Sequence, residues 1–382
     1  MKWVCVGQAM GSGRGKPKPK KTELDGKMYD HVTKVFITEQ HSVMLGWNED
    51  DDPQDVVDSF AALYSLTEDL KYQVFEFVKP KTNPNAIAAR KEREKREKLA
   101  AAMRHVPNWE KFGFQLFADT SKLGPMRKRL QKTLDAKADA TATEKKGFAL
   151  MMSNLENTSQ YHSSKFTADE RSFIVSALQW KGKDLLPVLD ALRVLMQHAD
   201  AVKTLSEDSK VRELLLAHLN DPAATKHQLM LSLRVLANLV ARRPRADKER
   251  KHGEAPQDVV QFITSAVAGS TRCVDTKADL PVRTAATVFL SNVICWIGMN
   301  KVKADALTKS IVDICIPALL AGGGKSNMIY YLLVATASAA RLKPEIKAYI
   351  APKVTGVPAA VKGALTQSVV EALADFRKVF GV

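Results

Sequence analysis

The stretch HQLMLSLRVLANLV (227–240) decides the fold class, because it is apolar around most of a helical circumference. A helix with this pattern is packed between neighbouring helices rather than lying on a surface. Among its polar residues, Arg234 and Asn238 lie four positions apart, on one narrow stripe. A buried guanidinium is costly unless it is paired. The stretch therefore predicts a helix inside a stack, with a polar stripe that needs a partner.

The same helical pattern continues through residues 106–382, with short connections and no strand signal. We expect helices at 121–136, 144–157, 167–178, 184–199, 209–220, 225–242, 256–268, 281–299, 303–321, 326–342 and 358–380. Many of them are apolar on several faces, which favours stacked helices with one shared core, as in an armadillo-like solenoid. Sequence similarity between the repeats is weak, so this prediction rests on helix length and packing pattern.

The N-terminal part of the chain has a different, mixed α and β pattern. Strands are expected at 29–37 and 42–47. A helix follows with Asp52 as N-cap and Pro53 at its first position, and a second helix at 67–78 is capped by Thr67. We therefore expect a small α+β domain over residues 1–84. A charged helical linker without an apolar face follows over 85–105, as a solvated single helix or a mobile tether, and the all-α domain covers 106–382.

Net charge points to an acidic or anionic partner. The chain has 57 Lys and Arg against 42 Asp and Glu, a net charge of +15. Nucleic acid, an anionic membrane or an acidic peptide fits such an excess. We find no apolar run long enough to span a membrane and no signal peptide, so membrane insertion is not expected. The four cysteines form no C-x-x-C pair, which fits reduced thiols in the cytosol or nucleus.

The search for catalytic and metal sites is negative. The chain has neither G-x-S-x-G nor H-E-x-x-H. The segment AGGGKS (321–326) resembles part of a phosphate-binding loop, but Leu319 stands where the first glycine is required, and no strand precedes it. A glycine turn at a helix end is the favoured interpretation. The histidines and cysteines lack metal-ligand spacing, so we expect no enzyme, metal or cofactor.

Three buried helices carry the polar residues that suggest a binding site. Arg234 and Asn238 are either satisfied within the helix stack or line a groove between repeats, where the arginine fork suits a carboxylate. Arg193 either pairs locally with Asp190 or faces the same groove. For Asn292, in the middle of an apolar helix, a structural amide is the favoured interpretation.

Two phenylalanines of the N-terminal domain are candidates for a second surface. Phe60 and Phe77 lie on its two short helices, and core packing is the usual role of an aromatic residue at helical spacing. A domain of this size has limited core space, however. The alternative is that both close an exposed apolar patch that binds a protein.

These residues resemble a known family. The segment DGKMYDHVTKVFI…HSVMLGWNEDDDPQDVVDSFAALYSL is similar to the PFU domain of the phospholipase-A-2-activating protein family. The segments LQWKGKDLLPVLDALRVLMQH, HQLMLSLRVLANLV and VRTAATVFLSNVI resemble, in the same order, motifs of the PUL domain that follows it. The resemblance covers nearly the whole chain, and the order of the motifs makes it specific.

The resemblance implies a non-enzymatic adaptor in ubiquitin-dependent protein degradation and ubiquitin recycling, in the cytoplasm and nucleus. The PFU domain would bind ubiquitin and ubiquitylated proteins, with Phe60 and Phe77 matching two residues of the contact. The PUL domain would be an armadillo-like fold whose basic groove binds the C-terminal tail of the AAA ATPase of the valosin-containing-protein type. Arg193, Arg234, Asn238, Asn292 and Tyr331 match that groove.

Two departures from the family pattern bear on this function. Tyr331 stands where the family usually has a second groove arginine, which is expected to weaken tail binding unless Lys325, Arg341 or Lys343 compensates. The family's N-terminal WD-repeat propeller is also missing from this sequence.

Two functions of other classes compete with the adaptor. A helical-repeat protein that binds nucleic acid would use the basic tracts at 13–21, 89–98 and 241–251 and would lose affinity steeply with salt. It is disfavoured, because the helical region has no repeated base-reading residues. A lipase or lipase activator follows only from the family's name, and no nucleophile constellation supports it.

Overall fold

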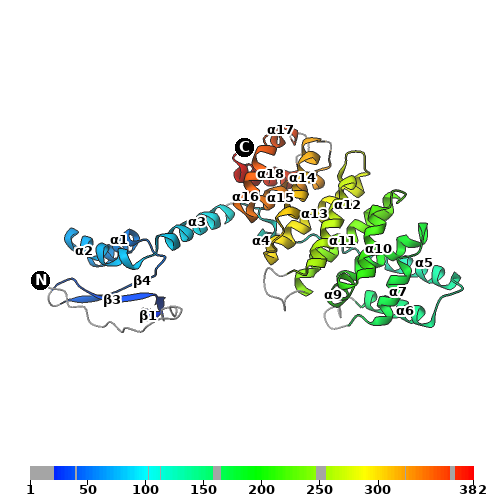
Figure 1. The fold of residues 1–382 in the computed structure, drawn as a ribbon, viewed down its shortest axis with the longest axis horizontal. Helices are drawn as coiled ribbons and strands as arrows, with labels where there is room; N and C mark the ends of the chain where they lie inside the picture. The colour runs from blue at the N-terminus through cyan, green and yellow to red at the C-terminus, as the bar shows by residue number, and fades with distance from the viewer. Residues whose placement is uncertain are drawn as a thin grey trace. The chain divides into compact units, whose positions relative to one another are not determined.

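The computed structural model describes residues 21–38, 41–101, 103–111, 113–157, 165–246, 255–322, 324–361 and 366–382. It divides into two compact units, Met1–Ala102 and Met103–Val382. The first unit contains all the strands of the described residues, and the second is helical (Figure 1). The expected fold class, a small α+β domain followed by an all-α armadillo-like domain, is confirmed.

The first unit is built from two β-hairpins and two helices. Strands β1 (Thr22–Leu24) and β2 (Lys27–Tyr29) pair antiparallel, and β3 (His31–Phe36) pairs with β4 (Ser42–Trp47) in the register Thr33↔Leu45. The β1–β2 hairpin was not predicted. Its turn at Asp25 and Gly26 has φ of 51° and 76°, the left-handed geometry that two-residue hairpins favour. Gly46 is required in β4, because a Cβ there would lie 2.7 Å from the ring of Tyr29.

Helices α1 (Pro53–Tyr64) and α2 (Glu68–Val78) cover one face of the β3–β4 hairpin. The expected caps are present: the Asp52 carboxylate accepts the Gln54 N–H at 2.9 Å, and the Thr67 hydroxyl accepts the Leu70 N–H at 3.4 Å. Alternate residues of the two strands point toward the helices, as the pleat requires. They form one core with the inner faces of α1 and α2: Val35, Leu45, Trp47, Val57, Phe60, Ala61, Leu66, Val74 and Val78.

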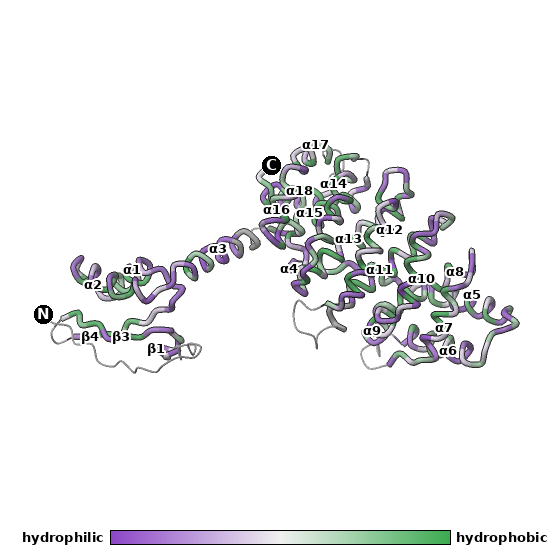
Figure 2. The backbone as a smooth tube through the Cα atoms, in the orientation of Figure 1, coloured by the Kyte–Doolittle hydropathy of each residue, from purple (hydrophilic) through white to green (hydrophobic). Residues whose placement is uncertain are grey.

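The charged segment after this core is a helix of the first unit. The 3-10 helix η1 (Lys79–Lys81) leads into α3 (Pro84–Ala101), which carries hydrophilic residues along its length (Figure 2). The start of α3 is tied down, because the Asn83 N–H donates to the Glu49 carbonyl at 2.8 Å and Arg90 pairs with Asp51. The helix was expected. Its attachment to the small domain was not, since a mobile tether was the alternative considered.

The second unit is a stack of helices that sequence periodicity located well. Its described helices are α4 (Asn108–Lys111), α5 (Leu123–Ala136), α6 (Ala142–Glu156), α7 (Ala168–Ala177), α8 (Leu185–Leu195), α9 (Ala199–Glu207), α10 (Ser209–Asn220), α11 (Lys226–Ala246), α12 (Gln257–Val274), α13 (Leu280–Asn300), α14 (Asp305–Leu320), α15 (Ser326–Leu342), α16 (Pro344–Ile350), α17 (Val357–Ala360) and α18 (Gln367–Phe380), with the 3-10 helices η3 (Gly182–Asp184) and η4 (Ala351–Lys353). The expected helix at 358–380 is shorter than predicted, because α17 precedes α18 as a separate turn. Helices α4, α9 and α16 were missed.

The central helices of this unit pack in the order α8, α11, α13, α15, and Figure 1 shows the last three side by side. Helix α13 is buried along nearly all of its length. It is also the single helix of the described residues that is long and apolar enough to cross a membrane, with a mean hydropathy of 1.4. Our expectation that no run reaches that length was therefore wrong. Since 83% of that window is buried inside the unit, α13 is read as the core helix of the stack.

Candidate functional site

The polar residues of the buried helices hold an extended segment of the chain itself. Residues 113–120, which we call the strap, have no regular secondary structure and run across α13, α11 and α8. The Asn292 side chain accepts the Gln115 N–H at 2.9 Å and donates to the Gln115 carbonyl at 2.8 Å. Asn238 does the same for Phe117, at 2.8 and 3.1 Å. Each amide thus bonds both backbone groups of one strap residue. Gln115 and Phe117 are two residues apart, so an extended chain presents their backbone groups on the same side.

The two asparagines also link the helices beneath the strap. Asn292 donates to the Ala237 carbonyl of α11 at 3.0 Å, and Asn238 donates to the Arg193 carbonyl of α8 at 2.8 Å. Both side chains are at most 1% exposed. The interpretation of Asn292 as a structural amide is therefore confirmed, and it extends to Asn238. Of the two readings of Asn238, satisfaction within the stack is correct, with the strap as the additional partner.

Arg193 binds the C-terminal half of the strap. Its guanidinium donates to Asp190 on the same helix at 2.8 Å, to the Phe117 carbonyl at 2.6 Å and to the Asp119 carbonyl at 2.8 Å. The residue is only 6% exposed. The expected local pair with Asp190 is present, but the side chain is not an open cation. Its predicted part in tail binding stays a prediction.

Arg234 has no such partners. Its guanidinium lies 4.9 Å from the centre of the Phe117 ring of the strap. No hydrogen bond or ion pair joins it to any other described residue, and its buried Nε lacks an acceptor. Burial lowers the pKa of Arg234, and the neighbouring charge of Arg193 lowers it further, while Asp190 opposes both effects. The stripe in the opening helix therefore contains one half-buried cation that the described protein leaves unneutralised.

A cavity of about 840 Å³ opens beside Arg234. The strap, α5, α8 and α11 supply its walls. Apolar side chains form much of the lining: Leu116, Phe117, Pro125, Met126, Leu186, Pro187, Met230 and Leu231. Four cations face two carboxylates there, and one of the carboxylates, Asp190, is already paired with Arg193. Lys122 and Arg129, both exposed, add positive charge at the rim. Such a cavity suits an acidic ligand that also carries an apolar or aromatic group.

The predicted groove residues therefore fall into two sets. Arg193 and Arg234 line the cavity, whereas Asn238, Asn292 and Tyr331 contact the strap. Tyr331 donates to the Gln115 side chain at 3.3 Å, and burial raises its pKa. Sequence reasoning missed the strap, together with Lys122 and Arg129. The segment GFQLFADT (113–120) has no helical or strand periodicity. Its role therefore follows only from its hydrogen bonds to the Asn238 and Asn292 side chains in the structure.

The two phenylalanines of the first unit occupy different environments. Phe60 is 4% exposed and belongs to the core, so the usual role of an aromatic residue at helical spacing holds, and the expected exposed patch does not include it. Phe77 is 39% exposed and meets Trp47 edge-on. The Lys81 ammonium lies 3.2 Å from the centre of its ring. A direct contact of either ring with ubiquitin stays a prediction, and only Phe77 has the exposure for it.

Comparison with known proteins now identifies the family. A PUL domain model matches residues 114–380, from the strap to the last helix, and a PFU model, described as PLAA family ubiquitin binding, matches residues 1–86. The chain belongs to the PFU–PUL adaptor family. In this family the PFU unit binds ubiquitin and the PUL unit binds an AAA ATPase.

Solved structures of PFU–PUL pairs are also similar. The pair from Saccharomyces cerevisiae Doa1/Ufd3 shares 15% identity with this chain, with a TM-score of 0.44 over 94% of this chain and 100% of that one. A structure of PUL with a mutated PFU domain gives 16% and 0.45, with the same coverage. No curated protein matches the chain. The family assignment rests on the two family models.

The described residues contain no candidate metal cluster, and the Cys295 and Cys315 thiols are buried. No group of three metal-ligating side chains occurs among the described residues. In the AGGGKS segment, α14 ends at Leu320 and Gly322 has a φ of 64°, which is the helix-ending glycine turn that we expected. Burial raises the pKa of the Cys295 and Cys315 thiols to about 12. Neither is a thiolate at neutral pH, and the thiolate is the reactive form.

We predict that removing one amide of the PUL unit destabilises it. Asn238→Ala leaves the Phe117 N–H without its acceptor and the Arg193 carbonyl without the Asn238 donor. A buried unsatisfied group costs roughly 1–3 kcal/mol. Urea unfolding followed by circular dichroism should show this loss in the free energy of unfolding. Asn157→Ala, at an exposed asparagine that ends α6, should change it by less than about 0.5 kcal/mol. Equal values for the two variants would contradict the role of the strap contact.

The buried thiols give a second expectation. Cys295 and Cys315 should resist iodoacetamide at pH 8 in the folded protein and react in urea, as mass spectrometry of tryptic peptides would report. Their folded pKa of about 12 lies above the ordinary value of 9.0. The stability that they contribute is therefore full below pH 9 and falls as the pH rises from 9 to 12, since the unfolded chain alone releases these protons. Rapid labelling of the native protein at pH 8 would contradict the burial.

Proposed function

We propose that this protein is a non-enzymatic adaptor that binds ubiquitin through the PFU unit and the acidic C-terminal tail of a valosin-containing-protein-type AAA ATPase in the cavity beside Arg234. The observation that carries the proposal is the unneutralised guanidinium of Arg234 above an apolar cavity. A carboxylate of the tail would supply the missing partner, and an aromatic or aliphatic residue would fill the apolar part.

Charge supports this division of partners. Residues 103–382 carry 40 Lys and Arg against 26 Asp and Glu, whereas residues 1–102 carry 17 against 16. A basic PUL unit attracts an acidic tail over long range and raises the association rate. The PFU unit is close to neutral and offers the tail no comparable attraction. The positive charge of the chain is therefore concentrated in the unit that we propose binds the acidic tail.

The strap explains how the cavity keeps its shape. Phe117 lies against the Arg234 guanidinium while its backbone is bonded to Asn238 and Arg193. The arginine side chain is thereby held beside the cavity before any ligand arrives. A cation that is already positioned loses less conformational entropy on binding than a free surface lysine.

Joining the two binding units in one chain serves the adaptor function. A single ubiquitin contact is weak when the apolar surface is small, but the tether raises the effective concentration of a ubiquitylated client near the ATPase. Within this proposal the protein acts in ubiquitin-dependent degradation and ubiquitin recycling, in the cytoplasm and nucleus. Fluorescence microscopy of the tagged protein tests the location, and confinement to a membrane organelle would contradict it.

We predict that Arg234→Ala weakens binding of the ATPase tail peptide at least about tenfold, since truncating one side of a charged interfacial pair costs roughly 2–5 kcal/mol. Isothermal titration calorimetry with the full chain measures it. The matched control is Lys128→Ala, an exposed cation of α5 that does not line the cavity, for which the change should stay within about twofold.

Arg193→Ala separates a contact role from a positioning role. The variant loses the bonds to the strap and should weaken the peptide as well, but together with a fall in unfolding free energy that Arg234→Ala does not share. Wild-type affinity in a folded Arg234→Ala variant would contradict the proposed function. Binding of wild type to any acidic peptide regardless of its apolar residue would show that the cavity itself is not used.

A further inference from the structure

The charged helix α3 begins at a point that the PFU unit holds in place. The segment that leads into it, KPKTNPN (79–85), is rich in helix breakers, yet the Asn83 N–H in its middle donates to the Glu49 carbonyl at 2.8 Å. The Asn83 side chain then accepts the Asn85 N–H at 3.0 Å and caps the helix. The first turn of α3 is therefore positioned by the folded unit, and the chain does not pivot at this segment.

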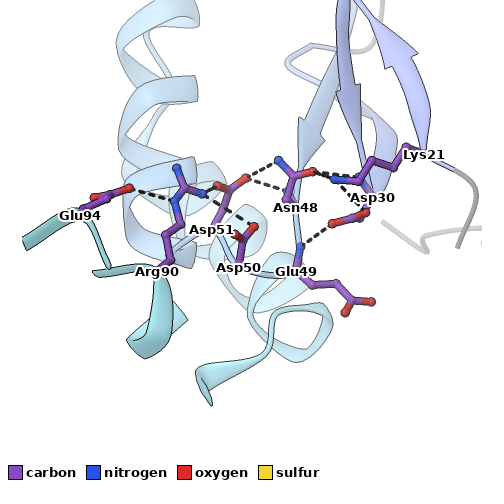
Figure 3. A network of polar contacts seen from close by, with 8 residues as sticks. All are labelled: Lys21, Asp30, Asn48, Glu49, Asp50, Asp51, Arg90 and Glu94. Carbon is purple, nitrogen blue, oxygen red and sulfur yellow. Dashed lines mark hydrogen bonds and ion pairs between the residues drawn. The ribbon is translucent and has the colours of Figure 1, made fainter. Parts of the chain in front are cut away.

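Two adjacent cations of α3 bind the acidic turn between β4 and α1. Arg90 bonds to Asp51, and its guanidinium lies 3.8 Å from the Asp50 carboxylate (Figure 3). Lys91 pairs with Asp52, the N-cap of α1. The hydrogen bond from the Lys91 ammonium lowers the pKa of Asp52. These pairs join residues that are 39 positions apart in the chain, so they fasten the helix to the unit.

The strands hold the carboxylates that receive these cations. Asp51 accepts the Asn48 N–H at 2.7 Å. The Asn48 side-chain oxygen in turn accepts the Asp30 N–H and the Lys21 ammonium, each at 3.2 Å (Figure 3). The network thus runs from the start of β1 through the end of β4 to α3. The acidic turn is positioned by the hairpins and does not depend on α3 for its shape.

The attachment of α3 is mainly electrostatic. None of the α3 side chains that the structure describes is buried, and Ile87, the one large apolar side chain among them, is only half-buried. Exposed ion pairs are individually weak, and salt screens them. The core of the unit, by contrast, is apolar and contains no residue of α3. The helix can therefore leave the unit while the core stays folded.

We propose that Arg90 and Lys91 form a reversible charge latch that switches α3 between a docked arm and a free tether. When the latch is closed, the PFU unit carries a helix of 18 residues, about 27 Å long, as a rigid arm. When it is open, the same segment lacks an apolar face to pack and becomes a flexible linker.

The two states differ in a property that matters to an adaptor. The stiffness and length of the segment between two binding units set the effective concentration of one ligand near the other. Within the proposed function, the latch therefore adjusts how closely a bound client is presented to the ATPase. The latch itself does not rest on the binding of either partner, so its test uses a distance within the PFU unit.

Pulsed electron spin resonance on the full chain measures that distance, with spin labels at Tyr72→Cys on α2 and Lys98→Cys near the end of α3. Both positions are exposed, and Cys5→Ser leaves three buried thiols in the background. At low salt the distance distribution should be narrow. The double substitution Arg90→Gln, Lys91→Gln should make it at least about twice as wide, because the pairs that hold the helix are lost. Sodium chloride at about 1 M should have the same effect on the intact latch, since it screens charges beyond about 3 Å.

The matched control is Arg93→Gln with Lys95→Gln, which removes the same charge from the next turn of the same helix. Arg93 pairs within α3, with Glu97 at 4.0 Å, and Lys95 is exposed. This variant should keep the narrow distribution. A broad distribution in the intact latch at low salt, or equal widths in the two double variants, would overturn the proposal.

Hydrogen exchange shows whether the arm detaches without unfolding the unit. The backbone amides of β3 and β4 should exchange at the same rate in the Arg90→Gln, Lys91→Gln variant as in the wild type, because their hairpin does not include α3. Unchanged exchange there, together with the broadened distance, supports a detachable arm. Faster exchange of these strands would contradict it, since the helix would then be part of the cooperative core.

Discussion

The structure depends on buried amides that bind the backbone of an extended chain segment. Asn238 and Asn292 lie in helices that are otherwise apolar, where a free amide would be costly. Each bonds the N–H and the carbonyl of one strap residue, Phe117 for Asn238 and Gln115 for Asn292, and also bonds to the next helix. The pairing satisfies polar groups of the helices and of the strap together. It also fixes the wall of the cavity.

Two arginines on neighbouring helices show how context decides the role of a residue. Arg193 is saturated by one carboxylate and two carbonyls, so it stabilises the strap. Arg234 has only an aromatic ring beside it, which attracts the guanidinium more weakly than a carboxylate does. The first is part of the scaffold, and the second keeps a charge that a ligand can neutralise. The adaptor mechanism needs both, because the scaffold positions the charge.

More of the fold than of the candidate site could be predicted from the sequence. The helices of the second unit follow from 3.6-residue periodicity, and the caps Asp52 and Thr67 follow from local hydrogen bonding, so both were predictable. The strap has no period, and its contacts span more than 70 residues of sequence. Phe60 was ambiguous because core and surface aromatic residues share one spacing. The attachment of α3 depends on ion pairs across 39 residues, which no local pattern encodes.

The central claim is that Arg234 pairs with a carboxylate of the acidic tail. A double-mutant cycle tests it most directly, with Arg234→Ala combined with replacement of each tail Asp or Glu by its amide. The account predicts a coupling energy of roughly 1–3 kcal/mol for one tail carboxylate and near zero for the others. Coupling near zero for every carboxylate, in variants that remain folded, would contradict it.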